Sequence, residues 1–146
     1  MLFSQTTEYA LRAVVTLASQ HNGPMTTQEI AQRARIPANY LSKLLDTLRK
    51  AGLVEAQRGV GGGFRLARPA SELTVLEVVN LVGPVGRVTG CPLGLAAHEG
   101  DLCALHRKLD QALSTIEQIF ASTTIGELLE DGHGTGAPSA CGSDGH

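Results

Sequence analysis

Apolar residues recur with the period of an α-helix in the first two segments of the chain. One segment starts near Gln5, where Ser4 or Thr6 can cap a helix, and stops at the turn sequence HNGP. The other covers TTQEIAQRA, in which Thr26 and Glu29 have the spacing of a capping box. The pattern predicts two amphipathic helices, of which the second is short.

A third helix is predicted from Pro37, a residue typical of a first helical turn, to Gly52, a residue typical of a helix end. Its apolar positions share one face: Leu41, Leu44, Leu45 and Leu48. Its polar positions point elsewhere: Asn39, Ser42, Lys43, Thr47 and Lys50. The third helix therefore combines a buried stripe with a polar, basic surface.

Two short runs of alternating apolar residues follow, at 53–57 and 64–67. The connection between them is rich in glycine, which supplies the positive φ angles and close approaches that a tight turn needs: Gly59, Gly61, Gly62 and Gly63. This pattern predicts a β-hairpin. Three helices followed by a hairpin is the order of elements in a winged helix-turn-helix.

Three more helices are predicted after the hairpin, around an aperiodic loop. Thr74 and Glu77 form the capping box of the first, and Thr124 and Glu127 cap the last. The helix between them carries a long apolar stripe: Leu102, Leu105, Leu109, Ala112, Leu113, Ile116, Ile119 and Phe120. So small a domain cannot cover this stripe, and we expect it to pack against a second copy of the chain.

The predicted fold is mainly α with a small β-hairpin, a winged helix-turn-helix followed by a long dimerisation helix. Its expected parts are a winged helix-turn-helix DNA-binding domain, a sensor loop, the dimerisation and closing helices, and a disordered tail, at 1–83, 84–100, 101–130 and 131–146. The tail is expected to be disordered because it consists largely of Gly, Ala and Ser with no apolar period.

Charge is distributed unevenly along the 146 residues. The whole chain has a net charge of -2, but the segment 33–68 holds eight basic and two acidic residues. Such a basic segment is typical of a surface that meets an anionic polymer. There is no export signal or membrane-spanning run, so we expect a cytoplasmic protein, and the three cysteines do not suggest a disulfide framework.

The third predicted helix suits the major groove of double-stranded DNA, because side chains near the start of such a helix reach base edges. We expect base contacts from Asn39, Ser42 and Lys43, with Tyr40 close by and Lys50 nearer the phosphates. The alternative is a solvated helix face in a structural bundle.

Arg58 precedes the glycines of the predicted hairpin tip, where the backbone can approach a duplex closely. An arginine there can enter a narrow minor groove or bind phosphate. The alternative is an ordinary exposed turn arginine.

The sequence CPLGLAAHEGDLCALH, residues 91–106, looks like an incomplete set of soft-metal ligands. Asp101 is expected to cap the following helix, which places Cys103 in the first turn, where the helix dipole stabilises a thiolate. His106 lies three residues later on the same face, so both side chains can reach one iron or zinc ion. Cys91, from the loop, is the third candidate ligand.

Several segments together identify a family resemblance: TTEYALRA, LSKLLDTLRKAGLV, RGVGGGFRL and TIGELL. The chain resembles the Rrf-type winged-helix regulators from about residue 1 to 130. The resemblance implies a homodimeric transcription factor, joined through the long helix, that binds a roughly palindromic operator. In many members three cysteines in the loop before that helix hold an iron–sulfur cluster.

The family pattern, Cys followed twice by five residues and a further Cys, matches this chain in part. Cys91 and Cys103 match the outer cysteines and His106 the frequent histidine, but Ala97 stands at the middle position. The resemblance also implies that Glu8 of the partner subunit can complete the site, although a first-turn acid is favoured by the helix dipole without any metal.

Other features of the site stay open at this point. His98 and Cys141 are further candidates for a fourth ligand. The cysteines could instead act as redox thiols, bind zinc or have no sensing role. A metalloenzyme or electron carrier is disfavoured, because no general acid or base accompanies the cysteines. An interaction module that has lost DNA binding is the remaining rival.

Overall fold

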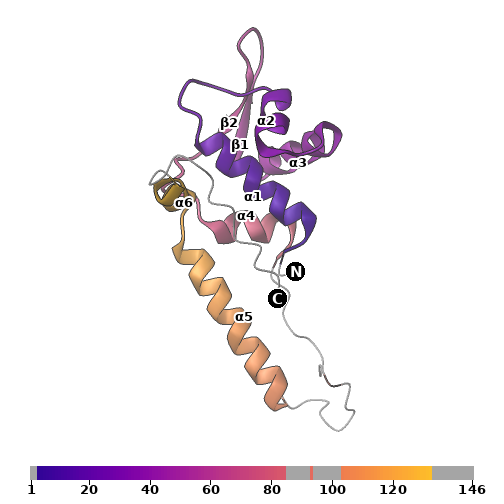
Figure 1. Cartoon of the computed structure of the whole chain (residues 1–146), viewed down its shortest axis with the longest axis vertical. Helices are drawn as coiled ribbons and strands as arrows, with labels where there is room; N and C mark the ends of the chain where they lie inside the picture. Colours follow the sequence, from indigo (N-terminus) through magenta and orange to yellow (C-terminus); the bar gives the residue numbers. More distant parts are fainter. Residues whose placement is uncertain (1–2, 85–92, 94–102, 133–146) are drawn as a thin grey trace, which may run out of the picture.

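The computed structural model describes residues 3–84, 93 and 103–132 of the chain (Figure 1). In chain order the elements are α1 Gln5–Ala18, α2 Thr27–Ala34, α3 Ala38–Lys50, β1 Val54–Gln57, β2 Gly63–Leu66, α4 Val75–Val82, α5 Ala104–Ser122 and α6 Ile125–Gly132. The fold is mainly helical with one antiparallel hairpin in the described part, so the predicted fold class is confirmed. No helix of the described residues is long and apolar enough to cross a membrane.

The helix starts follow local side-chain chemistry. Ser4 caps α1, its Oγ accepting a hydrogen bond from the Thr7 N–H at 3.2 Å. Capping boxes open α2 at Thr26 and α4 at Thr74, because each threonine exchanges hydrogen bonds with the glutamate three residues later. These predicted starts are confirmed. Pro37 is the N-cap of α3 rather than its first helical residue.

The hydrophobic core lies between α1, α2, α3, the hairpin and α4. All four leucines of the α3 stripe are buried, as predicted. They pack in one cluster with the apolar faces of the other elements, which include Val14, Ile30, Val54 and Val78. The exposed face of α3 is therefore held in place by a core that its other face fills.

The hairpin is anchored by the loop between α1 and α2 where strand β2 begins. Strands β1 and β2 pair antiparallel, with Val54 opposite Leu66 and Gln57 opposite Gly63. Met25 exchanges backbone hydrogen bonds with Phe64, at 2.9 and 2.7 Å. Gly63 permits this contact, because a Cβ atom there would lie 2.3 Å from the Met25 carbonyl oxygen. The glycine-rich segment thus closes the turn and fits the strand against the domain.

Helix α6 returns to the winged domain after α5. The Ile125 N–H donates to the Leu73 carbonyl at 2.8 Å, and the Val75 N–H donates to the Thr123 carbonyl at 2.9 Å. Ile125 itself is fully buried in the core. Helix α6 runs to Gly132, past residue 130 where the sequence suggested a boundary, and residues 133–146 lie outside the described part.

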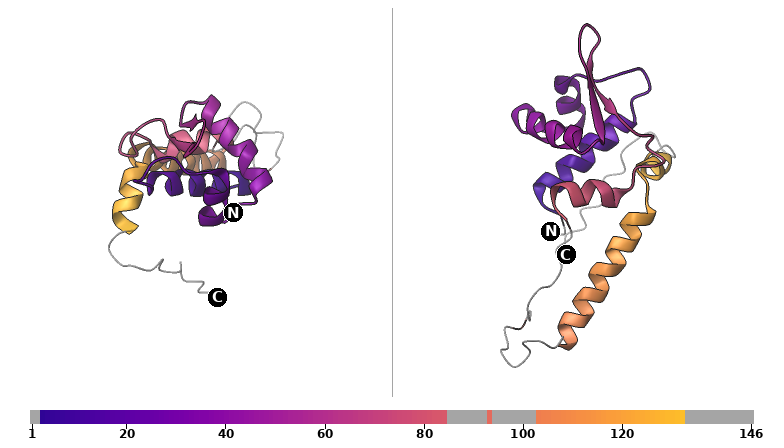
Figure 2. Two further views of the ribbon diagram at one scale, coloured as in Figure 1. Left: turned by 90° about the horizontal axis from the view of Figure 1, so that it is seen from above. Right: turned by 180° about the vertical axis from the view of Figure 1, so that it is seen from behind.

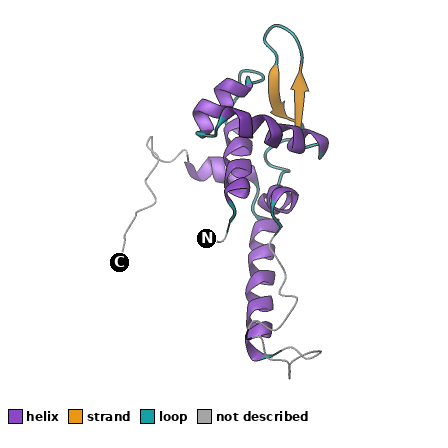
Figure 3. Cartoon of the chain, turned by 90° about the vertical axis from the view of Figure 1, so that its right-hand side faces the viewer, coloured by secondary structure: helices purple, strands orange, loops and turns teal. Residues whose placement is uncertain are grey.

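Helix α5 projects away from the rest of the described fold (Figures 1, 2 and 3). Its C-terminal end packs on α4, and its Phe120 ring stacks on Phe3 with the ring centroids 5.6 Å apart. No α5 residue is buried within the chain. From Leu105 onward the predicted apolar stripe is present on this helix and is exposed or only half-buried, whereas Leu102 lies outside the described residues.

Candidate functional site

The exposed face of α3 carries the side chains predicted to meet DNA bases. Asn39, Ser42 and Lys43 are all exposed. The Asn39 Oδ1 accepts from the Tyr40 N–H at 3.0 Å, and the Ser42 Oγ donates to the Ala38 carbonyl at 3.1 Å. The face is small, polar and cationic, as an element that enters the major groove requires.

Tyr40 points sideways from this face toward α1. It is half-buried, its hydroxyl is hydrogen-bonded to the Thr6 hydroxyl, and its ring meets the Tyr9 ring edge-on with centroids 5.2 Å apart. Tyr40 therefore braces α3 against α1, which holds the exposed face at a fixed angle. The sequence pattern did not predict that Thr6 contacts Tyr40, because the two residues are far apart in the chain.

An acidic residue holds the basic side chains at the end of α3. Asp46 accepts from Arg49 at 2.8 Å and lies 2.9 Å from the Lys50 Nζ. The hydrogen bond from Lys50, followed by that from Arg49, lowers the pKa of the Asp46 carboxyl below its usual value. Arg49, Lys50 and Asp46 together carry one net positive charge. This charge lies at the end of α3, where Lys50 was predicted to be near the phosphates.

The wing, defined here as residues 58–62 between the strands, extends beyond the domain. Arg58 is exposed in it, and Gly59 adopts φ +98° at the turn where the Gly62 N–H donates to the Gly59 carbonyl at 3.0 Å. Val60 at the tip is fully exposed. An apolar side chain in that position suits insertion into a minor groove.

A groove of about 670 Å³ separates the wing from the end of α3. Arg49 and Arg58 line it from the two elements. Figure 1 shows α3 and the hairpin at one end of the molecule and α5 directed to the other. Sequence reasoning missed Arg49 and Val60; the signals were a basic residue in the last turn of α3 and a lone β-branched residue among glycines.

Cys103 is the N-cap of α5. Its Sγ accepts a hydrogen bond from the His106 N–H at 3.3 Å, so α5 begins at Ala104 and the expectation that Asp101 caps this helix is wrong. The thiol takes the position where a cap oxygen would satisfy an N–H of the first turn. Cys103 and His106, three residues apart, are both half-buried.

Sulfur and imidazole nitrogen are ligands that iron and zinc accept, so these two residues fit part of a metal or cluster site. Cys91, Ala97, His98 and Cys141 lie outside the described residues. Within residues 3–84, 93 and 103–132, no group of three or more His, Cys, Asp or Glu residues could hold a metal ion.

Glu8 lies in the first turn of α1, with its carboxylate 3.9 Å from the Arg12 guanidinium. In Figure 1 the first turn of α5 lies at the end of α5 that is farther from α1. Glu8 and Cys103 of one chain are thus on separated elements. The prediction that Glu8 is a ligand therefore concerns Glu8 of the partner subunit.

Comparison with known proteins identifies the family. The sequence profile of Rrf2, described as an iron-dependent transcriptional regulator, matches residues 3–131. The chain belongs to the Rrf2 family. The transcriptional regulator IscR of Photobacterium profundum is 34% identical to this Rrf2-family chain over 124 residues, which cover 84% of the chain and 72% of that protein.

Solved structures support the same assignment for the Rrf2 fold. IscR of T. potens superimposes with a TM-score of 0.76 at 27% identity, covering 90% of this chain and 88% of that one. CymR of B. subtilis, named as a global cysteine regulator, gives a TM-score of 0.74 at 26% identity, covering 90% and 98%. The chain is a transcriptional regulator of this family rather than an enzyme.

Proposed function

We propose that this Rrf2-family regulator binds a double-stranded DNA operator as a homodimer. In this proposal α3 enters the major groove with Asn39, Ser42 and Lys43, and the wing lies against the adjacent minor groove with Arg58 and Val60. The observation that carries it is the groove lined by Arg49 and Arg58 between α3 and the wing. Tyr40 and Lys50 act beside this surface, Tyr40 by positioning α3 and Lys50 near the phosphates.

The proposed dimer joins two copies through α5. Leu105, Leu109 and Ile119 are 40%, 37% and 55% exposed on one apolar stripe, which a second α5 would cover. Two copies related by a two-fold axis present two α3 helices to DNA, so the operator is a rough palindrome. In this proposal the winged domain at 1–83 reads DNA and the helices at 101–130 join the copies, with a sensor loop at 84–100 between them, while α6 stays packed in the winged domain through Ile125.

Control of DNA binding is assigned to Cys91, Cys103 and His106. These residues would hold an iron–sulfur cluster, with Glu8 of the partner subunit as a further ligand, and the cluster would supply sensitivity to iron or to oxidants. Cys103 caps α5 and His106 lies in its first turn, so a metal or cluster bound there would contact the helix that sets the separation of the two DNA-reading domains. Operator affinity responds if that separation changes.

A second candidate for the signal is thiol or zinc chemistry without a cluster. It is favoured by Ala97, because the middle cysteine of the usual family pattern is missing. Both candidates use the same DNA-binding surface. They differ in whether the cysteines hold an iron–sulfur cluster, or instead bind zinc or act as redox thiols.

DNA binding is tested by the salt dependence of duplex affinity, measured by fluorescence anisotropy with the full chain. Each lost phosphate contact lowers the slope of log K against log salt by about one. Arg58→Ala should lower both affinity and slope. Lys108→Ala removes a lysine from the exposed surface of α5 and should change neither. Equal slopes for the wild type and Arg58→Ala would exclude the wing from the phosphate contacts.

The cluster is tested by the visible absorption spectrum of protein purified without oxygen. Charge-transfer bands that vanish in Cys103→Ala and persist in Cys141→Ala would support a cluster at the proposed site. A spectrum without bands after attempted cluster reconstitution would leave the thiol and zinc alternative.

A further inference from the structure

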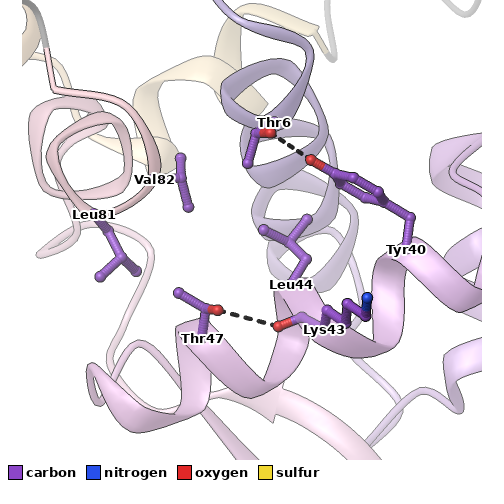
Figure 4. Close-up of a pocket in the computed structure, with 7 residues that line it drawn as sticks. All are labelled: Thr6, Tyr40, Lys43, Leu44, Thr47, Leu81 and Val82. Atoms are coloured by element: carbon purple, nitrogen blue, oxygen red, sulfur yellow. Dashed lines mark hydrogen bonds between the residues drawn. The ribbon is translucent and has the colours of Figure 1, made fainter.

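A pocket of about 320 Å³ is enclosed by α3, the start of α1 and the end of α4 (Figure 4). Its apolar wall consists of Leu44 from α3 and of Leu81 and Val82 from the last turn of α4. The volume is at the small end of the range for sites that bind small molecules. The pocket therefore suits a short aliphatic group.

Hydroxyl groups provide the polar part of the same pocket. Thr6 and Tyr40 share one hydrogen bond between two hydroxyls, so one O–H of the pair remains able to donate to a ligand. The Thr47 hydroxyl donates to the Lys43 carbonyl at 3.1 Å and keeps its lone pairs. A ligand that accepts a hydrogen bond from the Thr6–Tyr40 pair would fit between these groups.

Lys43 supplies a positive charge at the rim. It makes no salt bridge among the described residues, unlike the nearby basic residues Arg49 and Lys50. Figure 4 shows its ammonium turned away from Leu81 and Val82. The long, flexible lysine stem can rotate that charge toward an anion in the pocket.

We propose that this pocket binds a small aliphatic carboxylate as an effector. The carboxylate accepts a hydrogen bond from the O–H of the Thr6–Tyr40 pair and forms an ion pair with the Lys43 ammonium. The aliphatic tail contacts Leu81 and Val82. This assigns a ligand site at the junction of α3 and α4, separate from the site assigned to Cys91, Cys103 and His106.

Binding in the pocket competes with DNA, a consequence that rests on the proposed function. Lys43 is one of the residues assigned to the operator, and its single ammonium cannot serve the ligand and the DNA in full at once. Because linkage between two ligands is reciprocal, the carboxylate weakens operator binding by the same factor by which the operator weakens carboxylate binding.

Isothermal titration calorimetry of the full chain with 4-methylpentanoate tests the site directly, without DNA. The neutral isostere 4-methylpentanamide is the ligand control. Loss of one charged hydrogen bond should weaken binding roughly tenfold or more, both for the amide and in Lys43→Gln. Lys50→Gln makes the same charge change on the same helix outside the pocket and should bind as the wild type does.

Two further variants fill or alter the cavity itself. Leu81→Phe narrows it from α4, and Thr47→Leu narrows it from the exposed side of α3. Both should weaken binding, and circular dichroism reports whether each variant is folded. Absence of any saturable heat with wild-type protein would overturn the proposal, and so would binding that Lys43→Gln, Leu81→Phe and Thr47→Leu leave unchanged.

The DNA step is measured separately, by adding 4-methylpentanoate to the anisotropy assay. Weakened duplex binding in the wild type, but not in folded Leu81→Phe, supports the coupling. Carboxylate binding by a protein that binds no duplex would contradict the proposed function while leaving the pocket assignment intact. Unchanged duplex affinity at saturating carboxylate would overturn the effector role.

Discussion

Helices α3 and α5 have the same pattern of apolar residues and very different surroundings. In α3 the stripe Leu41, Leu45 and Leu48 is completely buried within the chain. In α5 the corresponding leucines, Leu105 and Leu109, remain 40% and 37% exposed. Amphipathic periodicity thus shows that a helix needs a cover, and the tertiary structure shows whether its own chain provides that cover.

The difference assigns distinct tasks to the two helices. Burial of its stripe fixes α3 in the winged domain, so its polar face is presented rigidly. Helix α5 contacts the described fold near its C-terminal end, through α4 and the stacking of Phe120 on Phe3. Its remaining apolar surface is the part that the proposed second copy completes.

The largest expected effect comes from opening a cavity under α3. Leu48→Ala should lower the free energy of unfolding by about 2–5 kcal/mol, because Leu48 is fully buried and the core can collapse only in part. Urea denaturation at fixed protein concentration measures this. A loss of less than about 1 kcal/mol would contradict the tight packing of the α3 stripe.

The matching change in α5 should separate the copies and leave the winged domain folded. Leu109→Glu places a carboxylate in the proposed apolar interface and should raise the dimer dissociation constant by roughly a hundredfold or more. Sedimentation equilibrium measures it. Gln111→Glu, on the other side of the same helix, is the control. If both variants sediment as the wild type does, α5 is not the dimer interface.

A smaller, pH-dependent effect is expected at the start of α4, the helix on which α5 leans. The Arg68 guanidinium donates to Glu77 at 2.7 Å and lowers the pKa of that carboxyl below 4.5, with help from the Thr74 N–H. The stabilisation is therefore present above about pH 4.5 and is lost as the pH falls through the lower, folded-state pKa.

Glu77→Gln keeps a side chain that can form the capping box and removes the charge. It should destabilise the protein by about 0.5 kcal/mol near neutral pH, since the pair is partly exposed and screened, and by less in acid. Denaturation midpoints of the variant and the wild type, measured near neutral pH and in acid, give the loss of stability at each pH. Glu29→Gln changes the capping box of α2, which has no salt bridge among the described residues, and should show no such pH dependence. An equal loss at both pH values would exclude the ion pair as the cause.

A comparably small effect is expected in the turn between α2 and α3. Arg35 adopts φ +55°, a conformation that costs most residues energy and glycine little. Arg35→Gly should stabilise the fold by about 0.5 kcal/mol, whereas Arg33→Gly, inside α2, should destabilise it by about 1 kcal/mol. Denaturation midpoints distinguish the signs, and destabilisation by Arg35→Gly would mean that its side chain contributes more than the strain costs.

Local chemistry made much of the fold predictable. The boxes at Thr26 and Thr74, the leucine stripe of α3 and the glycines of the wing each act over a few residues, so the sequence carries their signal directly. The return of α6 is different, because Ile125 is buried through contacts with Leu73, which is distant in the chain. Periodicity cannot reveal such a pairing.

The candidate site divides in the same way. Exposure of Asn39, Ser42, Lys43 and Arg58 follows from the helix period and the turn. The turn of Tyr40 toward Thr6 depends on how α3 packs on α1. The N-cap of α5 was also not predictable from the sequence. Aspartate is a commoner cap than cysteine, so Asp101 was expected, but the thiol of Cys103 caps the helix.

The most direct test of the central claim is selection of duplexes from a random pool by the full-length protein, followed by sequencing. If α3 reads DNA from a fixed position and α5 joins two copies, the selected duplexes should be enriched in an inverted repeat. This enrichment should be lost in Lys43→Gln. In Leu109→Glu it should be reduced to weak half-sites. Enrichment of a single unrepeated motif would contradict the symmetric dimer. No enrichment at all would contradict DNA recognition by α3 and the wing.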